Sequence, residues 1–362
     1  MQVSDDPELF KLMLDDTAEA SDLYKPTNYW AIYGKKFIPE LQEYGLYNFR
    51  KRRNSVLSSF GATDLSHTLG QIDLFQSKVF YNRITKKIPL WSEFLSLQNT
   101  LLNKILPVAG TYKIEEFEQM FYEFIRMYGE KIGAKSVDKF EASLAGNPEG
   151  IIKIDGRVYT MAVLGFYIQY VYCCNFINFD DVKIMVELGS GSGKQIEVMK
   201  KLYPDMCFLL FDIPPQLYVC EQYLKSVFPG DVVSYRETKQ MDFFPGDHKG
   251  KIFMFGNWKF PMIEEIPVDL FWNAASFQEM EPEVVANYLK FVNRAAKAVY
   301  LLEVMGGKEV ASKKGNRGVL KQIIIEDYKK GLTNFKLRDM SPPYWPISKR
   351  SMYSFSFWEC GK

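Results

Sequence analysis

A glycine-rich segment in the middle of the chain has residue types that let a ligand approach the backbone closely. The segment Ile184–Lys194 is a short apolar run, then an acidic residue and alternating glycines: Glu187, Gly189, Gly191 and Gly193. Glycine is needed where the chain turns sharply or where a Cβ would block a ligand. A phosphate-binding P-loop would require glycine in place of Leu188 and Ser or Thr in place of Gln195. The dinucleotide-binding fingerprint would require glycine in place of Lys194, so both of these sites are excluded.

The remaining pattern, an acid followed by three alternating glycines at a strand-to-helix turn, resembles the first motif of class I S-adenosylmethionine (SAM)-dependent methyltransferases. The resemblance implies that the loop faces the methionine part of SAM and that the Glu187 carboxylate helps to hold it. A second acid, Asp212, ends the apolar run Met206–Phe211, nineteen residues after Gly193. A carboxylate at this strand end can accept hydrogen bonds from both ribose hydroxyls. The sequence therefore predicts SAM as the cofactor.

The adenine end of the cofactor should lie near the end of the third core strand, for which two segments compete. These are Val232–Arg236 and Ile252–Phe255. We favour the second, because Asn257 and Trp258 then offer an amide and a ring beside the base; Val232–Asp247 is in that case an insertion. Asn273, on the next strand, completes the cofactor contacts that we expect.

The fourth strand and the loop at its carboxyl end, Val268–Met280, should lie between cofactor and acceptor. An acceptor hydroxyl is a poor nucleophile while protonated, so a positioned base would help the reaction. Glu279 is the first candidate for this base, although it would serve equally well as a cap of the following helix. Glu303, at the end of the fifth strand, is the second candidate, and His67 is the third.

Short motifs spread along the chain narrow the resemblance to the sugar O-methyltransferase family of bacterial surface-glycan biosynthesis. They are Tyr29-Trp30, Gly45-Leu-Tyr-Asn-Phe-Arg50, Glu141 with Gly146-Asn-Pro148, Phe211-Asp-Ile-Pro214 and Ser276-Phe-Gln-Glu-Met280. The resemblance implies methyl transfer from SAM to a sugar hydroxyl of a glycan or glycan precursor. Tyr344 and Trp345 would stack on a sugar face beside the acceptor pocket. No cluster of acids and histidine follows the fourth strand, so we expect no metal.

Two other functions remain open. Ser341-Pro-Pro-Tyr344 resembles the motif of amino-methylating nucleic-acid methyltransferases, whose aromatic ring stacks on a flipped base. In those enzymes the motif ends the fourth strand, whereas here it lies 148 residues past Gly193. A net charge of +1, from 45 basic and 44 acidic residues, also disfavours a nucleic-acid partner. The third possibility is a SAM-binding scaffold without catalysis.

The secondary structure that we expect to position these residues changes near residue 150, from mostly helical patterns to strands alternating with helices. Before it the patterns are mostly helical: Asp6–Ala20, Trp30–Tyr44, Trp91–Leu106, Ile114–Tyr128 and Ser136–Leu144. Gly146–Gly150 is a turn signal and the expected boundary between residues 1–150 and 151–362. We expect the helical part to cover the acceptor site or to form a homodimer contact.

Beyond the boundary, short apolar runs alternate with helical patterns. The expected helices include Pro215–Phe228, Glu281–Ala296 and Val319–Lys330, and the last expected strand is Ser351–Glu359. Such alternation predicts a Rossmann-like α/β fold of the class I methyltransferase kind, with a mainly parallel sheet and helices on both faces.

The composition limits the classes of protein to which the chain can belong. The 362 residues are 47% apolar and 25% charged, which excludes a disordered chain, and 15% aromatic, which favours core packing with some rings left for a ligand. Five cysteines without a CxxC pair and an N-terminus without an apolar signal region favour the cytoplasm. The uncharged stretch Val158–Phe179 is interrupted by polar residues, so we expect a buried helix and no transmembrane segment. The basic run Phe49–Asn54 would be a solvated helix end or would meet an anionic group.

Overall fold

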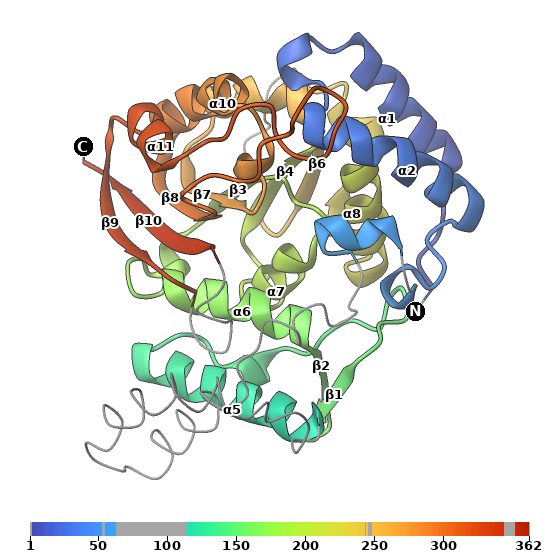
Figure 1. Ribbon diagram of the computed structural model, residues 1–362. Coiled ribbons are helices and arrows are strands. Elements are labelled where there is room, and N and C mark those ends of the chain that lie inside the picture. Colours follow the sequence, from blue (N-terminus) through green and yellow to red (C-terminus); the bar gives the residue numbers. More distant parts are fainter. Residues whose placement is uncertain are drawn as a thin grey trace, which may run out of the picture.

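The computed structural model of the chain describes residues 2–52, 55–62, 114–242, 244, 248–343 and 352–361 (Figure 1). Its centre is an eight-stranded sheet in the order β5-β6-β4-β3-β7-β8-β10-β9. The strands are β3 (Ile184–Leu188), β4 (Cys207–Asp212), β5 (Val232–Val233), β6 (Ile252–Gly256), β7 (Val268–Ala274), β8 (Ala296–Glu303), β9 (Phe335–Ser341) and β10 (Ser354–Cys360).

The strand directions agree with the predicted fold. All pairings from β5 to β8 are parallel, while β10 runs antiparallel to both β8 and β9. Helices connect successive parallel strands, as a parallel sheet requires. The prediction of a mainly parallel, Rossmann-like sheet of the class I methyltransferase kind is confirmed.

Helices cover both faces of this sheet, and successive strand residues point to opposite faces. Met185 belongs to the apolar cluster under α6 (Met161–Cys173), α7 (Lys194–Leu202) and α8 (Pro214–Val227). Its neighbour Val186 belongs to the cluster formed with η7 (Asn257–Glu265), α10 (Pro282–Ala295) and α11 (Ile325–Gly331). Because both faces are buried, the strands are continuously apolar, and this is why they were recognisable in the sequence.

The third core strand is β6, which pairs with β4 from Phe208 to Asp212, so the choice of Ile252–Phe255 is confirmed. The competing segment also joins the sheet. Val232–Val233 forms β5, which pairs with the outer edge of β6, and a short helix, α9 (Tyr235–Thr238), follows it.

The N-terminal part, where described, is mostly helical, as predicted. Its helices are α1 (Pro7–Glu19), η1 (Asp22–Tyr24), α2 (Asn28–Tyr44), η2 (Phe49–Lys51), η3 (Val56–Phe60), α5 (Ile114–Ile132) and η5 (Val137–Lys139). One apolar cluster contains Leu9 and Leu41 from this part together with Phe208 of the sheet. The core therefore runs across the expected boundary at residue 150.

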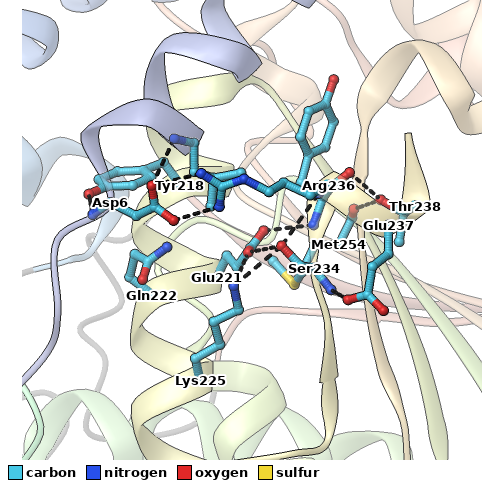
Figure 2. A network of polar contacts seen from close by, with 12 residues as sticks. Asp6, Tyr218, Glu221, Gln222, Lys225, Ser234, Arg236, Glu237, Thr238 and Met254 are labelled. Atoms are coloured by element: carbon cyan, nitrogen blue, oxygen red, sulfur yellow. Dashed lines mark hydrogen bonds and ion pairs between the residues drawn. The ribbon is translucent and has the colours of Figure 1, made fainter. Parts of the chain in front are cut away.

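Polar contacts fasten α1 onto α8 and α9 (Figure 2). The Asp6 carboxylate caps α1, accepting from Leu9 N–H, and forms an ion pair of 2.5 Å with Arg236. The Asp6 N–H donates to the Tyr218 hydroxyl at 2.8 Å. The buried Glu221 accepts from the Ser234 hydroxyl at 2.6 Å, which fixes the start of α9.

The predicted helix over Ser136–Leu144 is wrong beyond the single turn at η5. The Ala142 N–H donates to the carbonyl of Val158, and the Ser143 N–H donates to the buried Glu197 carboxylate at 2.6 Å. These tertiary partners hold the backbone out of a helix. The hairpin that follows, β1 (Ile151–Ile154) and β2 (Arg157–Thr160), was not predicted.

Two further expectations need correction. The helix expected over Val319–Lys330 is reduced to α11, because Val319 and Leu320 are held extended by contacts to Glu309 and Glu281. In the described part of the basic run Phe49–Asn54, Lys51 is exposed, but Arg52 pairs with Glu40 at 3.0 Å and Arg50 is not solvated. Arg50 is fully buried and donates to the carbonyls of Ser143 and Ala145.

The uncharged stretch Val158–Phe179 contains the buried helix α6, as predicted. Within the described ranges, every helix is too short or too polar to cross a bilayer.

Candidate active site

A cavity of about 250 Å³ lies at the carboxyl ends of β3, β4 and β7. This is where ligands bind in open α/β sheets. Its walls include the glycine loop after β3, the loop after β7, helix α6 and the N-terminal part, together with residues of α8, α10 and the segment before β10. The cavity therefore joins the two predicted regions of the chain in one site.

The glycine loop has the left-handed backbone that its composition predicts. Gly189, Gly191 and Gly193 have φ values of +80°, +56° and +77°. A Cβ on Gly189 would lie 2.3 Å from the Ser276 hydroxyl oxygen, and one on Gly193 would lie 2.9 Å from the Cys220 sulfur. Gly189 and Gly191 line the cavity, whereas Gly193 packs against α8 behind it.

Two buried carboxylates, Glu187 and Asp212, face this cavity. Burial raises the pKa of Glu187 well above its usual range, and the negative charge of Asp212 raises it further. Burial also raises the pKa of Asp212 to about 7, although N–H donors from Gly191 and Ile213, both at 2.8 Å, act in the opposite direction. The pair makes this end of the cavity acidic and suited to a cationic ligand.

Buried polar atoms of four side chains in the cavity wall have no hydrogen-bond partner within the described part of the chain. They are Oε2 of Glu187, both amide atoms of Gln195, Oε1 of Gln216 and Oδ1 of Asn257. The other amide atom of Asn257 donates to the Tyr24 carbonyl and to the Tyr288 hydroxyl, both at 2.8 Å. Leaving such groups unsatisfied costs stability, so their gathering around one cavity indicates a polar ligand that spans it.

The sequence-predicted base Glu279 lines the same cavity from the loop after β7. It is buried and forms an ion pair with Lys308, whose ammonium lies 4.3 Å from the centre of the Tyr29 ring. Burial raises the pKa of Glu279 to about 7, while Lys308 and then the Tyr29 hydroxyl lower it. A carboxyl with this pKa can take up a proton near neutral pH.

Glu303, the second candidate base, is fully buried and does not line the cavity. Its two oxygens accept from the N–H groups of Ser276 at 3.3 Å and Gln278 at 3.1 Å. Burial raises its pKa to about 8. Glu303 therefore holds the loop that carries Glu279 and is a positioning residue.

Other predicted site residues lie elsewhere. The Asn273 amide donates to the Leu188 carbonyl at 2.7 Å and accepts from Phe277 N–H at 3.1 Å, so it joins β7 to β3 and does not line the cavity. The Trp258 ring packs against Gly256 and the Tyr235 ring, also outside the cavity lining. His67, Tyr344 and Trp345 lie outside the described residues.

The N-terminal part supplies a wall of the cavity, and most residues of this wall were not singled out in the sequence. Its lining residues are Lys25, Pro26, Thr27, Trp30, Ser59, Phe60 and Gly61. The Thr27 hydroxyl donates to the Glu279 carbonyl at 2.9 Å, and the Lys194 ammonium donates to the Gly61 carbonyl at 2.8 Å. Of these lining residues only Trp30 belongs to a motif noted in the sequence, Tyr29-Trp30. The others carry no such signal and lie far along the chain from the glycine loop.

Aromatic rings also line the cavity: Trp30, Phe60, Phe166, Tyr288 and Tyr353. Tyr353 is joined to the loop after β7 by a 2.8 Å hydrogen bond from Gln278. Across the described ranges, no three His, Cys, Asp or Glu side chains come together in a way that could hold a metal ion.

No protein-family model matches the sequence, and no curated protein matches it. Among solved structures, the mitomycin 7-O-methyltransferase MmcR matches with a TM-score of 0.34 at 12% identity, over 55% of this chain and 54% of that chain. The O-methyltransferase NcsB1 of neocarzinostatin biosynthesis, in complex with SAM and 2-hydroxy-5-methyl naphthoic acid, matches with a TM-score of 0.36 at 13% identity, over 55% of both chains. The chain spans about half the length of these proteins, and its activity must be inferred from the site itself.

Proposed function

We propose that this chain is a SAM-dependent methyltransferase. The observation that carries the proposal is the set of unsatisfied polar atoms around the glycine loop, next to two buried carboxylates. Glu187 and the backbone of Gly189–Gly191 would hold the amino-acid part of SAM, Asp212 the ribose hydroxyls, and Asn257 the base. When bound, SAM supplies an electrophilic methyl group on a cationic sulfur. The acidic lining of the cavity matches that charge.

We further propose that the acceptor is a sugar hydroxyl. The support is the resemblance of several motifs to sugar O-methyltransferases, together with the aromatic lining of the cavity, since aromatic faces pack well against sugar rings. Glu279 would accept the hydroxyl proton as the new C–O bond forms. The ion pair with Lys308 and the hydrogen bond from Tyr29 would keep this carboxyl oriented. The Thr27 hydroxyl would hold the backbone of Glu279 through its carbonyl.

Methylation of nucleic-acid amino groups is less well supported. Ser341 is the last residue of β9, at the sheet edge, and β8 and β10 lie between this strand and β7. The motif is therefore not at the end of the fourth strand, where such enzymes use it. Tyr344 lies outside the described residues.

We place the activity in the cytoplasm. All five cysteines, Cys173, Cys174, Cys207, Cys220 and Cys360, are free thiols, as a reducing compartment would keep them.

Calorimetric titration with SAM, S-adenosylhomocysteine, NAD and ATP tests the cofactor. We expect binding of the first two and none of NAD or ATP; the reverse would exclude a SAM site. Mass spectrometry of reactions with a panel of nucleotide sugars and glycolipid intermediates then tests the acceptor, by a mass gain of one CH2. Binding of SAM without product on any acceptor would support the scaffold instead.

The variant Glu279→Gln tests the base. We expect it to slow methyl transfer by about 100-fold or more, as loss of a general base does, with SAM binding retained. Glu303→Gln is the comparison: it keeps an acceptor oxygen for the loop, so its main effect should be on stability. If Glu303→Gln abolished turnover and Glu279→Gln left it unchanged, the assignment of the base would be wrong.

A further inference from the structure

The connection between β8 and α11, residues 304–324, is a strongly basic loop. It carries Lys308, Lys313, Lys314, Arg317 and Lys321 against the single acid Glu309, a net charge of 5 − 1 = +4, while the whole chain has a net charge of +1. In Figure 1 this is the orange segment that reaches toward the blue helices α1 and α2. The rest of the chain is therefore slightly acidic, and positive charge is concentrated on this loop.

Three sets of contacts fix the loop beside the cavity. Lys308 pairs with Glu279, which lines the cavity. Asn28, next to the lining residue Thr27, donates to the carbonyls of 316 and 318 at 3.0 and 2.9 Å and accepts from 315 N–H at 2.8 Å. The 320 N–H donates to the Glu281 carboxylate at 3.1 Å. Each anchor lies within two residues of the cavity wall.

The basic side chains between these anchors are free to meet a ligand. Lys313, Lys314 and Arg317 are exposed. In the part of the chain that the structure describes, none of the three forms an ion pair with a carboxylate, whereas their neighbour Lys308 does. Burial raises the pKa of Tyr29 well above its usual range, and the charge of Arg317 acts in the opposite direction, so this guanidinium lies on the same side of the molecule as Tyr29.

We propose that this loop binds a phosphate or diphosphate group of the acceptor, and this rests on the proposed function. Arginine and lysine together are the usual partners of phosphate oxygens, and a loop held by backbone contacts presents them at little cost in entropy. The acceptor would then enter with its sugar toward Glu279 and its anionic group on Lys313, Lys314 and Arg317. A soluble nucleotide sugar and a lipid-linked sugar diphosphate share this chemistry.

The test is a triple variant, Lys313→Gln, Lys314→Gln and Arg317→Gln, with a matched control. The control, Lys131→Gln, Lys153→Gln and Arg157→Gln, removes the same charge from exposed residues of α5 and the β1–β2 hairpin, at the opposite end of the molecule in Figure 1. Both are titrated calorimetrically with inorganic diphosphate and with UDP at low salt. We expect the loop variant to lose at least about tenfold in affinity and the control to match the wild type. Equal binding by both variants would overturn the proposal.

Two further arms separate the sources of the anion. Diphosphate binding is measured in competition with UDP-glucose in solution, and separately with a polyprenyl diphosphate sugar in neutral phosphatidylcholine vesicles. The source of the anion is the competitor that displaces diphosphate from the wild type and loses affinity in the loop variant. Binding of the loop to phosphatidylglycerol vesicles that diphosphate cannot displace would instead make it a membrane-binding surface and overturn the proposal. SAM binding is measured on the same variants. If the wild type binds diphosphate but does not bind SAM, the proposed function is disproved and the anion site remains supported.

Discussion

At the scale of single residues, the two carboxylates of the cavity differ in what they already bind. Both oxygens of Asp212 accept backbone N–H groups, whereas Oε2 of Glu187 has no partner within the described residues. Asp212 therefore holds the glycine loop as well as facing the ligand. Glu187 keeps an acceptor free, and only a bound group can satisfy it.

This difference predicts the effect of Asp212→Asn. The amide keeps one oxygen for the Gly191 N–H but loses the charge, so the fold should persist while SAM binding weakens by about 10- to 100-fold, the value of a charge-assisted hydrogen bond. Calorimetry gives the affinity and thermal unfolding shows whether the fold is intact. Asp242→Asn, at a side chain that is 94% exposed, is the matched control. An unchanged SAM affinity in Asp212→Asn would contradict the assignment of this residue.

Lys308 should set the pH range in which Glu279 works. The ammonium lowers the pKa of Glu279, which burial alone would raise beyond its value of about 7. A base acts when deprotonated, so Lys308→Met should move the acid limb of the kcat/KM profile to higher pH, and Lys308→Arg should move it back. The pH profile of methyl transfer measures this. An acid limb that stays in place in Lys308→Met would show that Glu279 is not the titrating group.

At the scale of elements, the glycine loop is fixed by contacts on two sides. Gly189 and Gly156 have nearly the same φ, +80° and +79°, but a Cβ on Gly156 would meet nothing within 4 Å. In both alanine variants the strain of a left-handed backbone should lower the free energy of unfolding by roughly 1 kcal/mol. Gly189→Ala must in addition displace Ser276 and the loop after β7. We expect Gly156→Ala to lower Tm slightly and Gly189→Ala to lower both Tm and SAM affinity; equal effects would show that the Ser276 contact is unimportant.

The parts of the site that the sequence predicted are those encoded locally. A few consecutive residues were enough to predict each of three features: the strand β3, the glycine turn after it, and Asp212 at the end of β4. The Lys308–Glu279 pair was not predicted, because the two residues are 29 positions apart and nothing in the sequence marks Lys308. Asn273 shows the converse: it lies on the expected strand, yet its side chain is used to join β7 to β3. A position on an element is predictable, whereas the direction and partners of a side chain depend on packing across the fold.

At the scale of the whole molecule, the site depends on the N-terminal part being docked. Thr27 and Asn28 reach the loops after β7 and β8, and the Asp6–Arg236 pair fastens the preceding helix. Breaking a distant anchor should therefore open the cavity. Aromatic residues take part in this docking as well, since the Phe10 ring of α1 stacks on the Tyr218 ring of α8 with their centres 4.8 Å apart.

Four buried carboxyl groups beside one cavity also give the molecule an unusual dependence of stability on pH. The folded-state pKa values of Asp212, Glu279 and Glu303 are about 7, 7 and 8, and that of Glu187 is raised well above its usual range. In the unfolded chain such groups lose their protons near pH 4 to 4.5. Between these limits the folded state binds more protons than the unfolded state. The contribution of these groups to the free energy of unfolding should therefore be fully present below about pH 4 and should be lost as pH rises through 7 to 8.

Thermal unfolding of the ligand-free protein at pH 5.5, 7.0 and 8.5, at constant ionic strength, checks this expectation. Tm should decrease across the series. Glu187→Gln should flatten the decrease because it removes one of the raised groups, while Glu43→Gln, at an exposed position, should leave it as in the wild type. A cationic ligand stabilises the deprotonated carboxylates, so saturating SAM should raise Tm most at pH 8.5. A Tm that rises with pH in the ligand-free protein would mean that these carboxyls are already charged in the folded state, which would contradict their raised pKa values, and SAM would then not raise Tm most at pH 8.5.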